Sequence, residues 1–322
     1  MPDDTERKSR ARSPEPPAAR REPLPWQEPK PAHEDPDAPE RVRRLLESPT
    51  YRQADRDVDF LNLDATRGPR LQIDYLKAEL GLEQRGVEHT VVVFGSTRIR
   101  EPAAARRRLD SLRAELERSP RDAELERRVH VAERLLDKAR YYDIAHELGG
   151  LVGNCAAGGD CRVLLMTGGG PGIMEAANRG AFDAGAQSIG LNIALPHEQY
   201  PNPYITPDLC FSFHYFAMRK LHFLLRARAL VAFPGGYGTL DEVFETLTLV
   251  QSRTIKPVPV VLVGESYWRR VVDIDFLVDE GVIDVEDREL FWYAESADEI
   301  WSTILAWNER NGTPLLAPPC GP

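Results

Sequence analysis

The chain contains little of what builds metal sites, disulfide frameworks or membrane spans. Four of its 322 residues are cysteines, and they form no CxxC pair and have no histidines at metal-ligand spacing. We therefore expect no bound metal, and reduced, partly buried thiols of the kind found in cytoplasmic proteins. No run of 18 apolar residues occurs, and the N-terminus has no apolar signal core. The sequence predicts a cytoplasmic protein that does not engage a membrane.

Positive charge is also scarce. The 41 lysines and arginines are outnumbered by 51 aspartates and glutamates, which gives a formal net charge of −10. Because nucleic-acid binding needs a basic face that neutralises many phosphates, we expect no nucleic-acid partner. A local basic pocket for one phosphate remains compatible with this composition. Hydrophobic residues make up 42% of the chain, enough to build the core of one large domain or two small ones.

The N-terminal part of the chain differs in composition from the rest. Residues 1–40 contain ten prolines and many charges of both signs. They cannot bury enough apolar surface to offset the entropy lost on ordering, so we expect a disordered tail. Residues 41–88 predict a helical extension, the main domain should occupy residues 89–310, and a C-terminal tail should follow at 311–322. The apolar residues at helical spacing in the extension include Leu71, Tyr75, Leu76 and Leu80.

A charged segment with helical periodicity interrupts the main domain at residues 101–140. Ser119-Pro120 in its middle is typical of an N-cap followed by proline at the first helical position. We predict a helical hairpin inserted after the first strand, which serves for packing or dimerisation, or for binding a specific partner. Its two apolar stripes are Leu109, Leu112 and Leu116, and Leu125, Val129, Ala132, Leu136 and Ala139.

Short apolar runs alternate with helical segments through the rest of the main domain. This alternation is typical of a parallel sheet in an α/β fold. We predict a Rossmann-like, doubly wound parallel sheet with helices on both faces, which would bind ligands at the carboxyl ends of its strands. The predicted strands lie at residues 89–94, 163–166, 189–194, 209–215, 230–233, 258–263 and 290–294.

Three turns of small residues follow predicted strands, at residues 95–97, 168–172 and 234–239. Turns that follow parallel strands lie at the same edge of the sheet. Glycine lets backbone N–H groups approach an anion, and the helix after each turn directs its positive end toward the same place. The three turns together indicate a bound phosphate. The second turn does not fit GxGxxG and no GxxxxGK[ST] occurs, so a monophosphate fits better than a dinucleotide or a triphosphate.

Charged residues flank the third turn. Arg219 and Lys220 lie on the predicted helix that precedes it, where they either cover a packed surface or face a site. Glu242 follows in the first turn of the next helix. It either complements the helix dipole or faces a ligand as an acid, base or charge stabiliser. Asp241 should point elsewhere, because consecutive helical residues differ by about 100° in direction.

These residues together resemble a known family. The segment Pro234-Gly-Gly-Tyr-Gly-Thr-Leu-Asp-Glu242 matches the pattern PGGxGTxxE, and Arg219-Lys220 stand at the expected distance before it. With Gly95-Ser96 and the turn at 168–172, the combination resembles the LOG (Lonely Guy) family from about residue 89 to 307. LOG proteins are cytokinin riboside 5′-monophosphate phosphoribohydrolases and are related to bacterial nucleotide 5′-monophosphate nucleosidases.

The resemblance implies an enzyme that splits a nucleoside 5′-monophosphate, either AMP or a cytokinin riboside 5′-monophosphate, into free base and ribose 5-phosphate. It implies no cofactor, and a homodimer or larger homo-oligomer. Arg219 and Glu242 become the catalytic pair. The residues expected to hold the substrate are Gly95, Ser96, Gly169, Gly170, Phe216, Lys220, Gly235, Gly236, Gly238 and Thr239.

The implied roles agree with the chemistry of glycosidic cleavage, which builds positive charge on the ribose. A carboxylate against the sugar stabilises that cation and orients or deprotonates the attacking water, and we expect Glu242 to do so. Arg219 would either hold the phosphate or hydrogen-bond to Glu242 and keep it ionised.

The sequence departs from the short plant-type pattern in its N-terminal 85 residues, in the inserted hairpin and at Phe216, where that pattern has methionine. Phe216 either stacks on a purine or packs in the core. The preferred base stays open. A non-catalytic nucleotide-binding or regulatory protein and a scaffold are alternatives on the same fold. Some relatives carry the label lysine decarboxylase, for which Lys220 would have to form a Schiff base, and nothing else in the sequence supports that chemistry.

Overall fold

A computed structural model describes residues 24, 28–158, 162–195 and 200–316. Contacts divide the chain into two units, Met1–Arg67 and Gly68–Pro322. The predicted disordered tail lies mostly outside the described residues, and its last three residues begin a helix.

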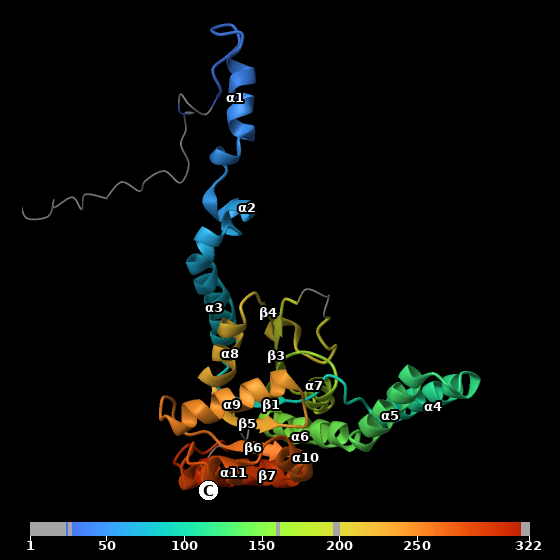
Figure 1. Ribbon diagram of the computed structural model, residues 1–322. Coiled ribbons are helices and arrows are strands. Elements are labelled where there is room, and N and C mark those ends of the chain that lie inside the picture. The colour runs from blue at the N-terminus through green and yellow to red at the C-terminus, as the bar shows by residue number, and fades with distance from the viewer. Residues whose placement is uncertain (1–23, 25–27, 159–161, 196–199, 317–322) are drawn as a thin grey trace, which may run out of the picture. The chain divides into compact units, whose positions relative to one another are not determined.

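The larger unit contains a sheet of seven strands, all parallel, in the order β4-β3-β2-β1-β5-β6-β7 (Figure 1). From β1 the chain adds strands outward to β4 at one edge, and from β5 it adds strands outward to β7 at the other edge. The strand order therefore reverses between β1 and β5, as in a doubly wound sheet. This confirms the predicted Rossmann-like α/β fold. The strands are β1 (His89–Phe94), β2 (Val163–Thr167), β3 (Ser188–Ile193), β4 (Cys210–Phe213), β5 (Ala227–Ala232), β6 (Val260–Val263) and β7 (Trp292–Ala294).

Helices cover both faces of this sheet, and each face has its own apolar core. On one face lie α6 (Arg140–Ala157), α7 (Ile173–Asp183) and α12 (Ala297–Arg310). On the other lie α3 (Arg67–Gln84), α8 (Phe216–Leu225), α9 (Tyr237–Gln251) and α10 (Glu265–Val271). The connecting segments include α11 (Ile274–Asp279) and the 3₁₀ helices η4 (Pro207–Leu209) and η5 (Val285–Glu289).

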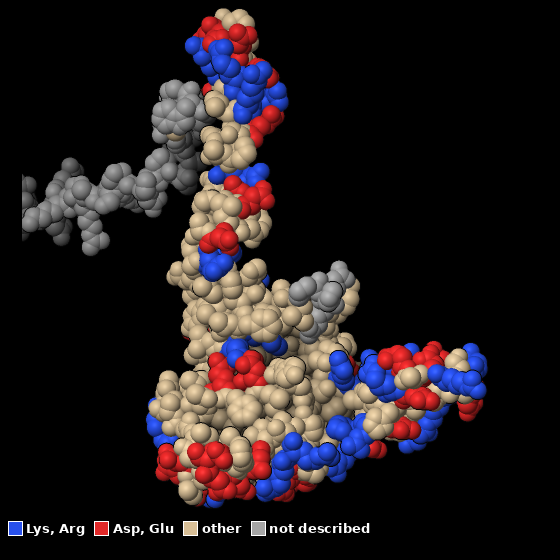
Figure 2. All heavy atoms as spheres, in the orientation of Figure 1, with Lys and Arg blue, Asp and Glu red and all other residues tan. Residues whose placement is uncertain are grey.

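The predicted hairpin is present as α4 (Pro102–Arg118) and α5 (Ala123–Asp137), which lie side by side and extend away from the sheet (Figure 1). Charged residues of both signs cover it (Figure 2). Its two predicted stripes pack against each other in a small core of their own. The predicted N-cap was wrong. Ser119 ends α4, and Asp122 caps α5 by accepting a hydrogen bond from the Leu125 N–H at 3.0 Å, because a carboxylate there reaches the free N–H groups.

Helices α3 and α8 differ in detail from the helices predicted there. The helix predicted around Leu76 and Leu80 exists as α3, but it buries Ala78 and Leu82 instead. The helix predicted around Arg219 ends at Leu225, because Arg226 turns away to pair with Glu79 of α3 through two hydrogen bonds of 2.7 and 2.8 Å. Strand β5 therefore begins three residues before the predicted position.

The cysteines also differ in part from expectation. Cys155 is disulfide-bonded, whereas Cys210 is a free thiol. The expectation rested on cellular compartment, which says nothing about which thiols the fold brings together. Cys161 and Cys320 lie outside the described residues. Among the described helices, none is long and apolar enough to span a membrane.

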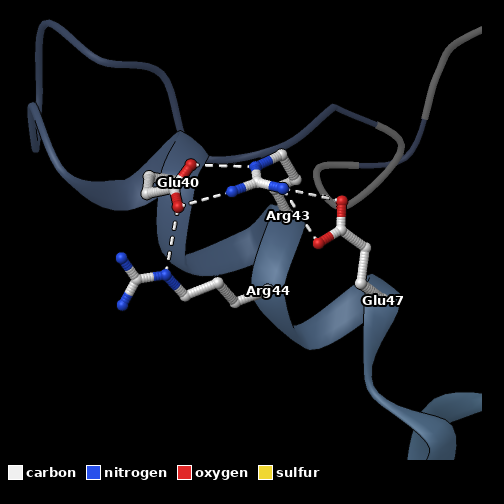
Figure 3. A network of polar contacts seen from close by, with 4 residues as sticks. All are labelled: Glu40, Arg43, Arg44 and Glu47. Carbon is white, nitrogen blue, oxygen red and sulfur yellow. Dashed lines mark hydrogen bonds and ion pairs between the residues drawn. The ribbon is translucent and has the colours of Figure 1, made fainter.

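The smaller unit consists of short helical segments. The exposed surface of its first helix carries a network of ion pairs (Figure 3). Arg43 lies between Glu40 and Glu47 at 2.7 and 2.8 Å, and Arg44 approaches Glu40 at 3.0 Å. These pairs are exposed and support the helix only weakly. The segments are α1 (Ala38–Glu47), η1 (Pro49–Tyr51), η2 (Ala54–Arg56), α2 (Val58–Leu61) and η3 (Asp64–Thr66).

Helices α6 and α7 pack unusually close to each other, which brings the backbone of one against the other. A Cβ added at Gly180 of α7 would lie 1.9 Å from the carbonyl oxygen of His146 in α6. A Cβ added at Gly150 of α6 would meet its nearest atom, the carbonyl oxygen of Gly180, at 3.8 Å. The two positions provide a matched pair of helical glycines with opposite surroundings.

We predict that Gly180→Ala lowers the free energy of unfolding by about 1–3 kcal/mol, because the two helices must separate. Gly150→Ala should raise it by up to about 1 kcal/mol, because alanine is the better helix former and has space there. Urea unfolding followed by circular dichroism measures both. Equal stability of the two variants would contradict this account of the helix packing.

Candidate functional site

The site lies at the carboxyl ends of β1 and β5, where the strand order reverses. Backbone hydrogen bonds join the turns there. The Ser96 N–H donates to the Pro234 carbonyl at 3.0 Å, and the Ile173 N–H donates to the Ser96 carbonyl at 3.1 Å. The three glycine turns therefore meet at one edge of the sheet, as the sequence predicts. Beside them is a cavity of about 640 Å³, within the usual range for small-molecule sites.

The structure brings most of the predicted site residues together around this cavity. Gly169, Gly170 and Lys220 are not part of its lining. The predicted residues that line it are Gly95, Ser96, Phe216, Arg219, Gly235, Gly236, Gly238, Thr239 and Glu242.

The third turn leads directly into α9 and leaves backbone donors at the cavity. The first intrahelical bond of α9 runs from the Leu240 N–H to the Gly236 carbonyl at 3.0 Å. The N–H groups of residues 237–239 precede it and have no acceptor within the helix. A Cβ at Gly235 would lie 2.1 Å from Thr239 Oγ1, so only glycine lets that hydroxyl fold back onto the turn. This arrangement can bind a phosphate at the helix N-terminus.

The second turn is held by a buried polar network that the sequence analysis did not anticipate. The Gly169 N–H donates to Thr167 Oγ1 at 3.0 Å, and the Gly169 carbonyl accepts from the Asn202 N–H at 2.9 Å. The Asn202 side chain donates to the Gly170 carbonyl at 3.1 Å and to Asn178 at 3.0 Å. Gly169 also has a φ of +71°, which favours glycine. These two glycines are engaged inside the loop.

Arg219 bridges the second turn and β3. Its guanidinium donates to the Leu191 carbonyl at 2.6 Å and to the Gly168 carbonyl at 3.3 Å, and it lies 5.1 Å from the centre of the Phe223 ring. Burial lowers its pKa, and the nearby Glu242 raises it. Among the described contacts, no ion pair joins Arg219 to Glu242, so their attraction acts through space.

Lys220 points to the exposed side of α9. Its Nζ lies 2.9 Å from carboxylate oxygens of both Asp241 and Glu245. Burial lowers the pKa of Lys220, but these hydrogen bonds outweigh it, so the pKa is raised overall. A Schiff-base lysine needs the opposite shift. The contact joins α8 to α9, and of its three residues only Asp241 lines the cavity.

Glu242 is the sixth residue of α9 and therefore lies in its second turn, one turn later than expected. The helix dipole acts mainly on the first turn, so dipole complementation does not account for this residue. Its side chain lines the cavity and is 8% exposed. Burial raises the pKa of Glu242 to about 7, although Lys220 and Arg219 oppose this shift. Such a carboxyl can donate or accept a proton at neutral pH.

Several residues around the cavity escaped the sequence analysis. Asp241 also lines it, against the expectation that it points elsewhere, because its exposed side chain lies at the rim. Tyr267 of α10 donates a hydrogen bond from its hydroxyl to the Gly235 carbonyl. Arg98 and Lys138 add positive charge. Of Tyr267, Arg98 and Lys138, only Arg98, which follows the first turn directly, carried a signal in the sequence.

We predict that the free energy of unfolding of Glu242→Gln, relative to the wild type, rises with pH. The pKa of this carboxyl is about 7 in the folded protein against an ordinary value of 4.5. The stabilisation from its protonation is therefore complete below about pH 4.5 and is lost as the pH rises through about 7. The neutral amide has no such loss, so the variant should gain on the order of 3 kcal/mol on the wild type between pH 4 and pH 8. Urea unfolding at both pH values tests this, and a difference independent of pH would contradict the burial of an ionisable group.

Comparisons with known proteins give relatives for part of the chain. Residues 174–304 match the family described as "Possible lysine decarboxylase". Cytokinin riboside 5′-monophosphate phosphoribohydrolase LOG3 of Arabidopsis thaliana is 31% identical over 186 residues, which cover 55% of this chain and 82% of that protein. Probable cytokinin riboside 5′-monophosphate phosphoribohydrolase LOGL5 of Oryza sativa subsp. japonica is 31% identical over 140 residues, 42% of this chain. The match spans 56% of the length of that rice protein.

Among solved structures, the Moco carrier protein of Chlamydomonas reinhardtii is similar to this chain with a TM-score of 0.39 and 19% identity. The match covers 68% of this chain and 99% of that one.

Proposed function

Because the chain belongs to the LOG family, we propose that it hydrolyses the N-glycosidic bond of a nucleoside 5′-monophosphate to a free base and ribose 5-phosphate. The observation that carries the proposal is the position of Glu242. A buried carboxyl with a pKa of about 7 lines the same cavity as a turn whose backbone donors suit a phosphate. Those two features are what a phosphoribohydrolase needs at opposite ends of a ribose.

In the proposed complex, the phosphate accepts hydrogen bonds from the N–H groups at the start of α9, and the ribose extends toward Glu242. The bond between ribose C1′ and the base nitrogen breaks, and its electron pair leaves with the base. Positive charge develops on the ribose, and the ionised Glu242 stabilises it. Water adds to C1′ and gives a proton to Glu242, which can pass it to the departing base.

Arg219 has a positioning role in this proposal. Its bonds to the Leu191 and Gly168 carbonyls fix the guanidinium beside the cavity. The positive charge there favours the ionised form of Glu242 and opposes the effect of burial. Phosphate binding by Arg219 would require its guanidinium to leave these carbonyls.

Phe216 lines the cavity and is 53% exposed, so stacking on a base is favoured over core packing. AMP and cytokinin riboside 5′-monophosphates are the proposed substrates. A cytoplasmic location and a homodimeric or larger assembly belong to the same proposal.

The direct test is incubation of the pure protein with a panel of nucleoside 5′-monophosphates, followed by chromatography for free base and an assay for ribose 5-phosphate. We expect turnover of at least one adenine nucleotide. Glu242→Gln should lower kcat by a factor of at least 100, because it removes both the charge and the proton acceptor, while nucleotide binding by calorimetry stays within about threefold. Glu245→Gln is the matched control, since it changes a carboxylate on the same helix outside the cavity lining.

The results separate the proposal from its alternative. Binding of a nucleotide without release of base from any member of the panel would favour a non-catalytic nucleotide-binding protein. Wild-type turnover in Glu242→Gln would remove Glu242 from the mechanism but leave the reaction itself standing.

The pH dependence provides a further prediction. If ionised Glu242 is the active form, kcat/KM should fall about tenfold for each pH unit below 7 and level off above it. The value near 7 follows from the raised pKa of Glu242 in the free protein. Initial rates across pH 5 to 9 measure it, and Glu245→Gln, which removes a charge that raises the pKa of Glu242, should shift the profile toward lower pH. A profile that is flat through pH 7 would exclude Glu242 as the titrating group.

A further inference from the structure

A second cavity of about 580 Å³ lies between the base of the hairpin and α10. It is lined by four cations and one carboxylate. The cations come from different elements and converge on it: Arg134 from α5, Lys138 at its end, Arg140 from the start of α6, and Arg270 from α10. Lys and Arg side chains gather in this region of the surface (Figure 2).

The positive charge of this basic pocket is poorly neutralised. Arg140 pairs with Glu295 at 3.3 Å, and the Lys138 ammonium donates to the Arg134 carbonyl at 3.3 Å. Among the described residues, no carboxylate forms an ion pair with Arg134 or Arg270. Asp137 is the one carboxylate in the lining, and together with Glu295 it offsets the four cations only in part.

The cations also repel one another. Burial lowers the pKa of Lys138, and the charges of Arg134 and Arg270 lower it further, while Asp137 opposes them. Like charges held together in a concave site are unfavourable in the free protein. A bound anion would relieve this repulsion and accept several charge-assisted hydrogen bonds.

The basic pocket adjoins the first cavity, lined by Glu242, which we call the catalytic cavity on the basis of the proposed function. Lys138 and Tyr267 line both. Tyr267 is also the residue whose hydroxyl donates to the carbonyl of Gly235 in the third turn. The basic pocket therefore lies next to the end of the catalytic cavity that is suited to a phosphate.

We propose that the basic pocket is a second anion site, which binds a phosphate group of a ligand that carries two or more phosphates. Arginine is suited to this role because its planar guanidinium meets phosphate oxygens in pairs. The pocket is small and concave, and the chain is acidic overall, so an extended nucleic-acid backbone does not fit. The phosphate comes either from a chain that extends out of the catalytic cavity or from a separate phosphate-bearing molecule. The proposal concerns binding and does not depend on turnover.

The test uses the full-length protein and pyrophosphate as the probe, in isothermal titration calorimetry at constant ionic strength. The variant is Arg134→Gln with Arg270→Gln, which leaves the lining of the catalytic cavity unchanged. The control is Arg127→Gln with Arg269→Gln, which removes the same charge from the same two helices outside the pocket. We expect the affinity for pyrophosphate to fall at least tenfold in the variant and less than twofold in the control.

Two further titrations distinguish the sources of the phosphate. If it belongs to a chain that extends from the catalytic cavity, ADP should compete with pyrophosphate, and the variant should lose affinity for ADP but not for AMP. If it belongs to a separate molecule, AMP and pyrophosphate should bind together, and the affinity for ADP should not change. Either result supports the site. Equal affinity of the wild type and the variant for pyrophosphate, or an equal loss in the control, would overturn it.

Discussion

The pairing of β1 with β5 is the constraint on which the site depends. These two strands run parallel through paired residues from Val91 with Ala229 to Phe94 with Ala232. The chain leaves them toward opposite faces of the sheet, so the turns that follow diverge and leave a cavity between them. The hydrogen bond from Ser96 to Pro234 holds the two turns at a fixed separation just beyond the strands. The first and third turns follow directly from these two strands, and the third leads into the helix that carries Glu242.

Burial of Glu242 raises the pKa of its carboxyl to about 7, and it makes the folded protein less stable once that carboxyl ionises. A carboxyl that is 8% exposed and forms no ion pair with any residue in the described part of the chain is costly to ionise. The neighbouring carboxylates Asp241 and Glu245 raise that cost, although each is paired with Lys220 at 2.9 Å. Lys220 supports the site from outside the cavity lining, because its single positive charge offsets these two carboxylates in part and lowers the pKa of Glu242 directly. The adjacent Arg219 faces the other way, toward the second turn.

The different positions of Arg219 and Lys220 illustrate which features of the site can be predicted from the sequence. The pattern around Pro234 identified the turn, the helix after it and the carboxylate, because these depend on local spacing. The alternation of apolar strands and helices predicted the sheet for the same reason. The local pattern alone treated Arg219 and Lys220 alike, and the family resemblance assigned Arg219 to catalysis and Lys220 to substrate binding. Only the packing of α8 against α9 and β3 shows that the two side chains point to different places.

Features that depend on tertiary contact could not be predicted. Tyr267 reaches the third turn from a helix that follows β6, 32 residues away from Gly235. The start of α5 depended on whether Ser119 or Asp122 could reach free N–H groups, and both are acceptable caps by type. Helix α3 buries Ala78 and Leu82, whereas Leu76 and Leu80, which suggested another buried face, are exposed. Which face of α3 is buried depends on its tertiary packing, which the spacing of leucines does not reveal.

The position of the hairpin links it to the site. It is inserted between β1 and α6, on the connection that leaves the reversal point of the sheet. An insertion in such a surface connection disturbs the core little, because it can form its own small core, as α4 and α5 do. Its base must return to the sheet beside the first turn, and this brings Lys138 into the lining of the catalytic cavity. An element added at that place changes the charge around the cavity without altering the strands β1 and β5, so the hairpin can modify the electrostatics of the site while the turns that follow the strands stay the same.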